Sequence, residues 1–249
     1  LEKRNLLKSW TLILSIATFT FSMIGTFLVR SGILNSVHTF ANDPERGVFI
    51  LIFLFSLIFL SIILFFIYQV NESRSEKNFF LISKETSILI NNWFMMYFLS
   101  VILIGTTYPI FLEVITNEKI SIGPPFFNKL IIPFLILFLI FMALGPNLKW
   151  IKDSYKNIKY SRVVLFFVCI FISFYIVKKT SSEILFISIL GGAALYLLFI
   201  TINEFLNKKN NFSQTISHFG FSLFVISILL NSLFSSEFSA NMKLGQELD

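Results

Sequence analysis

Seven long apolar stretches constrain this chain more than any other feature of its sequence. A bilayer has a hydrocarbon core about 30 Å thick, which a helix of about 20 residues crosses. A spanning segment must satisfy its own backbone hydrogen bonds, and continuous apolar runs do so as helices, whereas membrane β-barrels show alternating residues. The expected spans are 10–29, 48–68, 88–111, 130–148, 160–177, 184–205 and 216–234. We therefore expect an all-α fold, a polytopic integral membrane bundle of about seven transmembrane helices.

The composition agrees with this class. Hydrophobic residues make up 55% of the chain and charged residues 14%, which excludes an ordinary soluble domain. We expect residues 1–234 to form the helical bundle and residues 235–249 to begin an extracytoplasmic segment that is cut short. Because the chain starts at Leu1 rather than Met, we expect it to be a fragment. The first span is longer than the apolar region of a signal peptide, so we interpret it as retained.

The basic residues indicate an orientation. Thirteen of the 20 lysines and arginines fall on the same side as the N-terminus if all seven spans cross. Since cytoplasmic loops carry the excess of positive charge, we predict that the N-terminus is inside and the C-terminus outside. The net charge of +6 thus reflects membrane topology, and we expect no nucleic-acid partner. The fifth span is short, and its loss would invert everything after it.

Small residues and the single cysteine give two further expectations. The run from Gly191 through Gly192 to Ala194 would let span six approach a neighbour closely. Cys169 lies inside the fifth span. One thiol can form neither an internal disulfide nor a CxxCH haem attachment, so we interpret it as a buried structural cysteine.

His38 is one of only two histidines in the chain, and it lies in the polar loop that follows the first span. On the predicted topology it faces outward. Neutral imidazole is a common haem ligand, but a solvated loop histidine is the reading that local physics favours. Arg30 directly follows the first span. It either anchors the helix at the interface or pairs with a carboxylate of a bound ligand.

His218 lies about one turn inside the last span. Ionisable residues within spans are rare and often functional. The small neighbours Ser217, Gly220 and Ser222 leave room for a flat cofactor or for a close helix, and a histidine bonded to a neighbouring carbonyl is the equal alternative. On the predicted topology His38 and His218 lie at opposite membrane faces. Each would then need a second ligand from outside this chain.

Four segments carry a family resemblance. Residues 25–47, which include His38, residues 105–109 (GTTYP), residues 120–128 (ISIGPPFFN, with a rigid Gly-Pro-Pro turn) and residues 218–220 (HFG) resemble, in order, segments of the CcmF/CycK/CcsA family. CcmF proteins are haem lyase components of the cytochrome c maturation system. The resemblance covers essentially the whole chain and matches the middle-to-late part of the family. The family's tryptophan-rich WWD motif is absent, since the three tryptophans are isolated.

The resemblance implies a function and its residues. CcmF proteins receive haem from the chaperone CcmE and, with CcmH- or CcmI-type partners, attach it to the CxxCH cysteines of apocytochrome c. His38 matches the histidine that holds this transient outward haem, where Arg30 would pair with a propionate. His218 matches one axial ligand of a stable intramembrane haem b. The family's remaining haem ligands precede this region, so the fragment alone is not expected to be a competent enzyme.

The resemblance places the protein in a bacterial inner membrane, with the mitochondrial inner membrane as the alternative. Two other functions remain open at the level of sequence. A transporter or permease bundle could use His218 as a proton relay, although the spans contain no close carboxylate pair and no evident repeat. A structural membrane subunit would carry both histidines incidentally.

Overall fold

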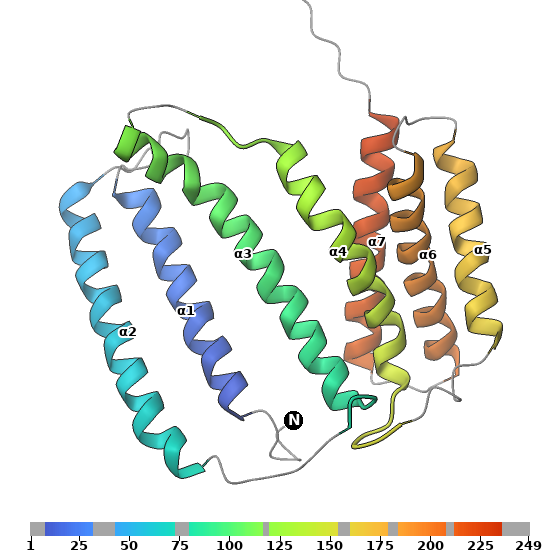
Figure 1. Ribbon diagram of the computed structural model, residues 1–249, viewed down its shortest axis with the longest axis horizontal. Helices are drawn as coiled ribbons and strands as arrows, with labels where there is room; N and C mark the ends of the chain where they lie inside the picture. Colours follow the sequence, from blue (N-terminus) through green and yellow to red (C-terminus); the bar gives the residue numbers. More distant parts are fainter. Residues whose placement is uncertain are drawn as a thin grey trace, which may run out of the picture. The chain divides into compact units, whose positions relative to one another are not determined.

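The computed structural model of the protein describes residues 8–31, 43–72, 80–116, 120–153, 160–178, 184–207 and 212–235. These residues form seven α-helices and a short 3-10 helix (Figure 1). All seven are long and apolar enough to cross a membrane, which confirms the predicted all-α polytopic fold. The orientation of the chain stays a prediction. The elements are α1 (Lys8–Arg30), α2 (Pro44–Glu72), α3 (Lys84–Thr116), α4 (Pro124–Leu144), η2 (Gly145–Asn147), α5 (Tyr160–Val177), α6 (Ile184–Leu206) and α7 (Phe212–Phe234).

Helix α2 begins before the apolar run because polar residues cap it. The Asp43 carboxylate accepts a hydrogen bond from the Arg46 N–H at 3.2 Å, and its other oxygen lies 3.1 Å from Arg46 Nε. Pro44 then occupies the first helical position, where a missing N–H costs nothing. Charged residues can therefore start a helix whose remainder is apolar.

Helix α4 differs most from its expected span of 130–148. The Gly123-Pro124-Pro125 sequence, expected as a turn, instead opens the helix, with a proline at its first position. At the other end Leu144 is the last α-helical residue, and η2 follows because Pro146 cannot continue the helix. Asn147 therefore lies in the 3-10 turn, beyond the apolar helix α4.

The chain divides into two compact units. The first, called here the N-terminal unit, contains Leu1–Asn78 and Thr107–Ile120. In it α1 packs beside α2, and a Cβ on Gly47 would lie only 3.0 Å from the Cα of Ser31. No residue of α1 is buried within the structure. Its apolar side chains are therefore available to lipid.

The second, C-terminal unit contains Phe79–Thr106 and Ser121–Asp249. Helix α6 lies at its centre, between α5 and α7 and also against α4 (Figure 1). A Cβ on Gly192 would lie 2.7 Å from the Cα of Ile170 in α5, so the expected close approach at this glycine is confirmed. Cys169 is fully buried in the same core, as expected of a structural thiol.

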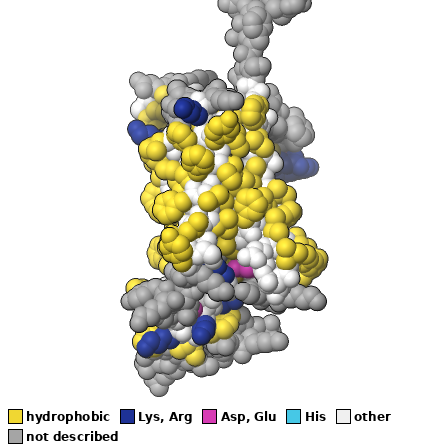
Figure 2. Space-filling view, turned by 90° about the vertical axis from the view of Figure 1, so that its right-hand side faces the viewer, with side chains coloured by type: hydrophobic (Ala, Val, Ile, Leu, Met, Phe, Trp, Pro, Cys, Tyr) yellow, Lys and Arg dark blue, Asp and Glu magenta, His cyan; other side chains and the backbone are white. Residues whose placement is uncertain are grey.

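The surface agrees with a membrane environment. Figure 2 shows, on one face, a broad band of hydrophobic side chains with lysine and arginine side chains toward its two ends. Large apolar residues are exposed on every helix, for example Phe59 and Phe171 at 69% and 70%. Such exposure is costly in water and ordinary in lipid.

Candidate functional site

Of the three residues predicted to bind haem, the structure describes Arg30 and His218 but not His38. His38 lies outside the described residues. Arg30 is the last residue of α1, in the N-terminal unit; it is half-buried, and its carbonyl accepts the Asp43 N–H at 3.0 Å. His218 lies in the second turn of α7, in the C-terminal unit. The pairing of His38 with Arg30 around an outward haem therefore stays a prediction, and His218 can be described in detail.

His218 is half-buried and lines a cavity of about 200 Å³. The cavity lies entirely within the C-terminal unit, between α3, α7 and the end of α4 with η2. Its lining residues are Lys84, Ser87, Ile88, Asn91, Phe141, Met142, Gly145, Pro146, Gln214 and His218. We call it the His218 cavity.

The polar side chains of the cavity come from α3 and α7. Lys84, Ser87 and Asn91 are separated by three and four residues, a spacing that places them on one face of α3. Gln214 and His218 are likewise four residues apart on α7. Two helices thus present hydrogen-bonding groups toward a common space.

Helix α4 supplies the apolar wall. Phe141 and Met142 line the cavity from its last turn, and Gly145 follows at the start of η2. A Cβ on Gly145 would overlap the Ser87 hydroxyl, so the start of η2 lies against α3 at this point. A side chain at position 145 would force the Ser87 hydroxyl to move.

A layer of packed aromatic rings lies one turn further along the same three helices. Phe138 is 1% exposed, and its ring makes edge-on contacts with Phe94, Phe98 and Phe221 at centroid distances of 5.8, 5.7 and 5.6 Å. Phe221 follows His218 by three residues, and Phe138 precedes Phe141 by three. Apolar rings, which we call the aromatic layer, therefore lie on the side of the cavity away from the N-terminal ends of α3 and α7.

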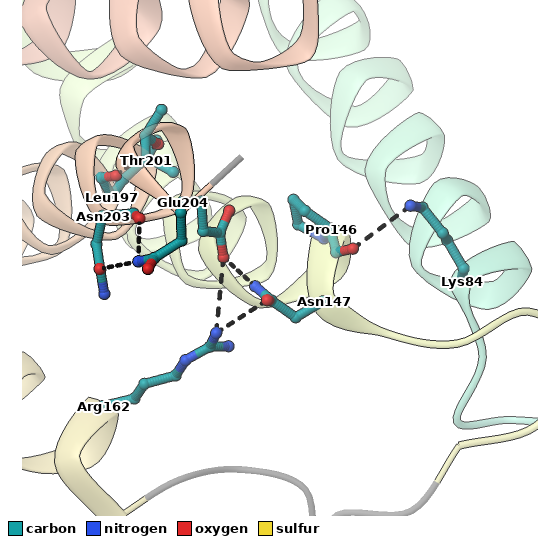
Figure 3. A network of polar contacts seen from close by, with 9 residues as sticks. Lys84, Pro146, Asn147, Arg162, Leu197, Thr201, Asn203 and Glu204 are labelled. Atoms are coloured by element: carbon teal, nitrogen blue, oxygen red, sulfur yellow. Dashed lines mark hydrogen bonds and ion pairs between the residues drawn. The ribbon is translucent and has the colours of Figure 1, made fainter. Parts of the chain in front are cut away.

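A buried polar network holds η2 in place (Figure 3). The Asn147 amide donates to the Glu204 carboxylate, and Arg162 donates to the Asn147 carbonyl oxygen at 2.9 Å. Arg162 also lies 3.7 Å from Glu204, and their side chains are only 19% and 6% exposed. This η2 network (Asn147, Arg162 and Glu204) joins η2 to α5 and α6, and so fixes one wall of the His218 cavity.

The chain after η2 is fastened to the start of α3. Three backbone hydrogen bonds of 2.7 to 2.9 Å join residues 80–84 to residues 149–153. Glu85, 1% exposed, accepts the Ile151 N–H with both carboxylate oxygens, at 2.9 and 3.2 Å. Ile151 has a φ of 70°, an uncommon conformation for a β-branched residue, which these bonds hold. These bonds tie the segment after η2 to the start of α3, where Lys84 lines the cavity.

His218 is the one His, Cys, Asp or Glu residue among the described residues that line the cavity. Among the described residues, no group of three or more His, Cys, Asp or Glu side chains could hold a metal ion. A lone histidine can instead serve as an axial ligand to an iron whose other ligands belong to a prosthetic group. Within the same residues no hydrogen bond engages the imidazole, so the alternative of a carbonyl-bonded histidine finds no support.

The size of the cavity bears on what can occupy it. Pockets that enclose a drug-sized ligand measure about 300–1,000 Å³. At about 200 Å³ the His218 cavity is smaller, and it can take one edge of a porphyrin rather than the whole ring. The donor set of an imidazole, two amides and an ammonium beside apolar walls fits such an edge.

Sequence reasoning found His218 but missed Lys84 and Gln214. Both precede the expected spans, which began at residues 88 and 216, whereas the helices begin at Lys84 and Phe212. Their spacing to Asn91 and His218 was visible in the sequence. That α3 and α7 face one another across the end of α4 was not.

The chain resembles proteins of known name along its whole length. It is 33% identical over 98% of its residues to "Cytochrome c-type biogenesis protein CcmF" of Haemophilus influenzae, and 33% identical over 100% to the protein of the same name from Escherichia coli. It covers 40% of the length of each. Over 61% of the chain, identity to the Pseudomonas fluorescens CcmF reaches 47%. No protein-family model and no solved structure matches the chain.

Proposed function

We propose that this chain, which belongs to the CcmF-type cytochrome c biogenesis proteins, takes part in cytochrome c maturation by binding haem within the membrane. The chain spans about two fifths of the length of the relatives that match it throughout. The attachment of haem to apocytochrome c is therefore proposed for the whole protein, to which this chain contributes ligands and a binding surface.

The observation that carries the proposal is the position of His218 at a cavity with one apolar and two polar walls. There the imidazole would ligate the iron of a stable haem b, and a second ligand would come from outside this chain. When bound, the haem supplies the redox chemistry. The chain's own residues orient it and exclude water: Asn91 and Gln214 offer amide donors, and Phe141 covers the site from α4.

His38 and Arg30 would serve the second, transient haem, which is the substrate. His38 holds the iron and Arg30 pairs with a propionate. In the attachment step a cytochrome thiol would add across a haem vinyl group: the S–H bond and the vinyl π bond break, and a carbon–sulfur and a carbon–hydrogen bond form. No protein nucleophile is needed. Support comes from the family resemblance of residues 25–47, which contain both side chains.

The same family suggests the setting. The relatives include a CycK protein of Rhizobium meliloti besides the CcmF proteins of Haemophilus influenzae and Escherichia coli, and these three come from bacteria. We place the protein in a bacterial inner membrane, with apocytochrome c, a CcmE-type haem chaperone and CcmH- or CcmI-type proteins as partners. The lipid membrane itself is expected from the seven apolar helices.

A haem spectrum tests the His218 assignment. In the purified full-length protein, His218→Ala should remove the b-type haem from the reduced-minus-oxidised spectrum, because the iron loses an axial ligand. Ser217→Ala is the control, since the Ser217 hydroxyl is bonded to the Ser213 carbonyl at 2.9 Å and does not line the cavity. Normal haem content in His218→Ala would overturn the assignment.

A maturation assay tests His38 separately. We expect His38→Ala to abolish the formation of holocytochrome c in cells while leaving the internal haem spectrum unchanged. Holocytochrome c formation reports on the site of the transient substrate haem, and the haem spectrum reports on the site of the resident haem. Unimpaired maturation in this variant would count against a haem ligand at position 38.

A further inference from the structure

Lys84 places a positive charge at the wall of the His218 cavity. It is half-buried, its Nζ lies 3.4 Å from the Pro146 carbonyl oxygen, and it lies 5.4 Å from the centre of the Trp150 ring. No carboxylate is among the residues that line the cavity. The ammonium is held by a backbone carbonyl and an aromatic ring, and no described anionic side chain faces it in the cavity.

The acidic side chains at this end of the unit are engaged elsewhere. Glu85 accepts the Ile151 N–H, and Glu204 is held by the η2 network. The Asp153 carboxylate accepts the Lys149 N–H at 2.9 Å. Within the described residues no carboxylate forms an ion pair with Lys84. The Lys84 ammonium, with three donors, therefore has a carbonyl and a ring as partners but no described carboxylate to neutralise its charge.

The local field also favours an anion. Lys84 is the first residue of α3, and Gln214 is the third residue of α7, so two helices present their N-terminal ends at the same cavity. Helix N-termini carry partial positive charge. The Lys84 charge adds to this partial positive charge, so an anion in the cavity would meet a positive potential from both sources.

We propose that Lys84 binds a carboxylate of the ligand whose iron His218 ligates, a haem propionate, and so sets the orientation of that ligand in the cavity. This inference rests on the function proposed for His218. Lys84 and Gln214 lie at the helix ends, whereas His218 is one turn deeper and the aromatic layer lies beyond it. The carboxylates then lie at the polar end, and the ring edge lies toward the apolar interior.

The test compares haem with haem dimethyl ester, in which both carboxylates are blocked. The full-length protein, prepared without haem and reconstituted in nanodiscs, is titrated with each compound, and the ratio of the two dissociation constants is measured. The protein should prefer haem by at least about tenfold, or about 1.4 kcal/mol. Lys84→Gln should remove this preference by weakening haem binding alone, and Lys84→Arg should retain it.

Lys149→Gln is the matched control, because Lys149 is an exposed lysine at the same end that does not line the cavity. It should keep the full preference. An unchanged ratio in Lys84→Gln overturns the role of Lys84 and leaves His218 untouched. If Lys84→Gln binds neither haem nor haem dimethyl ester, Lys84 has a structural role and the proposal is also overturned. If His218→Ala binds haem as tightly as the unchanged protein, the proposed haem site itself fails.

Discussion

At the edge of the His218 cavity, α3 and η2 come into close contact at Gly145, which has no side chain. Gly145 lies where a Cβ would overlap the Ser87 hydroxyl, so the contact between α3 and η2 is tight at a glycine on one side and a small residue on the other. Added volume in a packed interior is not absorbed freely. The two residues should therefore behave as a coupled pair.

Gly145→Ala should lower the stability of the protein by about 1–3 kcal/mol, the usual range for overpacking. In a Ser87→Ala background the same change should cost clearly less, because the overlapping oxygen is gone. Equilibrium unfolding in mixed micelles measures both. Gly25→Ala in α1 is the control, since nothing lies within 4 Å of its Cβ position. Equal costs with and without Ser87 would contradict the predicted contact.

The residues of the site divide into those that sequence could find and those that it could not. His218 was visible because an ionisable residue inside a span is rare. Lys84 was not, because a lysine just before an apolar run is ordinary at a membrane interface. Only the packing of α3 against the end of α4 shows that its side chain reaches the cavity.

At the scale of elements, the position of η2 depends on a buried charge pair. The carboxylate of Glu204 and the guanidinium of Arg162 are both largely removed from water, and Asn147 bridges them. Breaking such a pair leaves an uncompensated charge, whereas replacing both members by apolar residues is often neutral.

Glu204→Ala should therefore destabilise the protein by about 3–5 kcal/mol. The double change Arg162→Met with Glu204→Leu should cost much less than the single change. The comparison pair is Arg46 with Asp43, where Arg46 is 74% exposed and its removal should cost at most about 1 kcal/mol. A small effect of Glu204→Ala on thermal unfolding would show that the network does not hold η2.

Element boundaries show where sequence reasoning stops. Residues 160–177 were predicted as a span, and α5 has the same bounds because its flanks are plainly polar. Helix α4 begins at Pro124, before the predicted residue 130, since prolines that suggest a turn are equally suited to start a helix. Which helices contact one another depends on side-chain packing that a hydrophobic pattern does not encode.

At the scale of the whole molecule, the seven spans follow from composition and length, but the division into two compact units does not. The predicted orientation depends on a modest excess of basic residues on one side of the membrane. If the fifth span did not cross, every segment after it would be inverted. Because α5 is short, it is the element to test.

Cysteine labelling can test the orientation, since the single thiol of this chain, Cys169, is buried. Lys152 and Lys178 are exposed on either side of α5. We expect Lys178→Cys to react with an impermeant maleimide in spheroplasts, and Lys152→Cys to react only after permeabilisation. The reverse pattern would invert the predicted topology, and labelling of both from one side would mean that α5 does not cross.

The central claim is that the His218 imidazole supplies an iron ligand, and rescue by free imidazole tests it most directly. His218→Gly in the full-length protein should lose the b-type haem spectrum and recover it when imidazole is added, because the small ligand can occupy the space that the side chain leaves. An unaltered spectrum in His218→Gly without imidazole would contradict the claim.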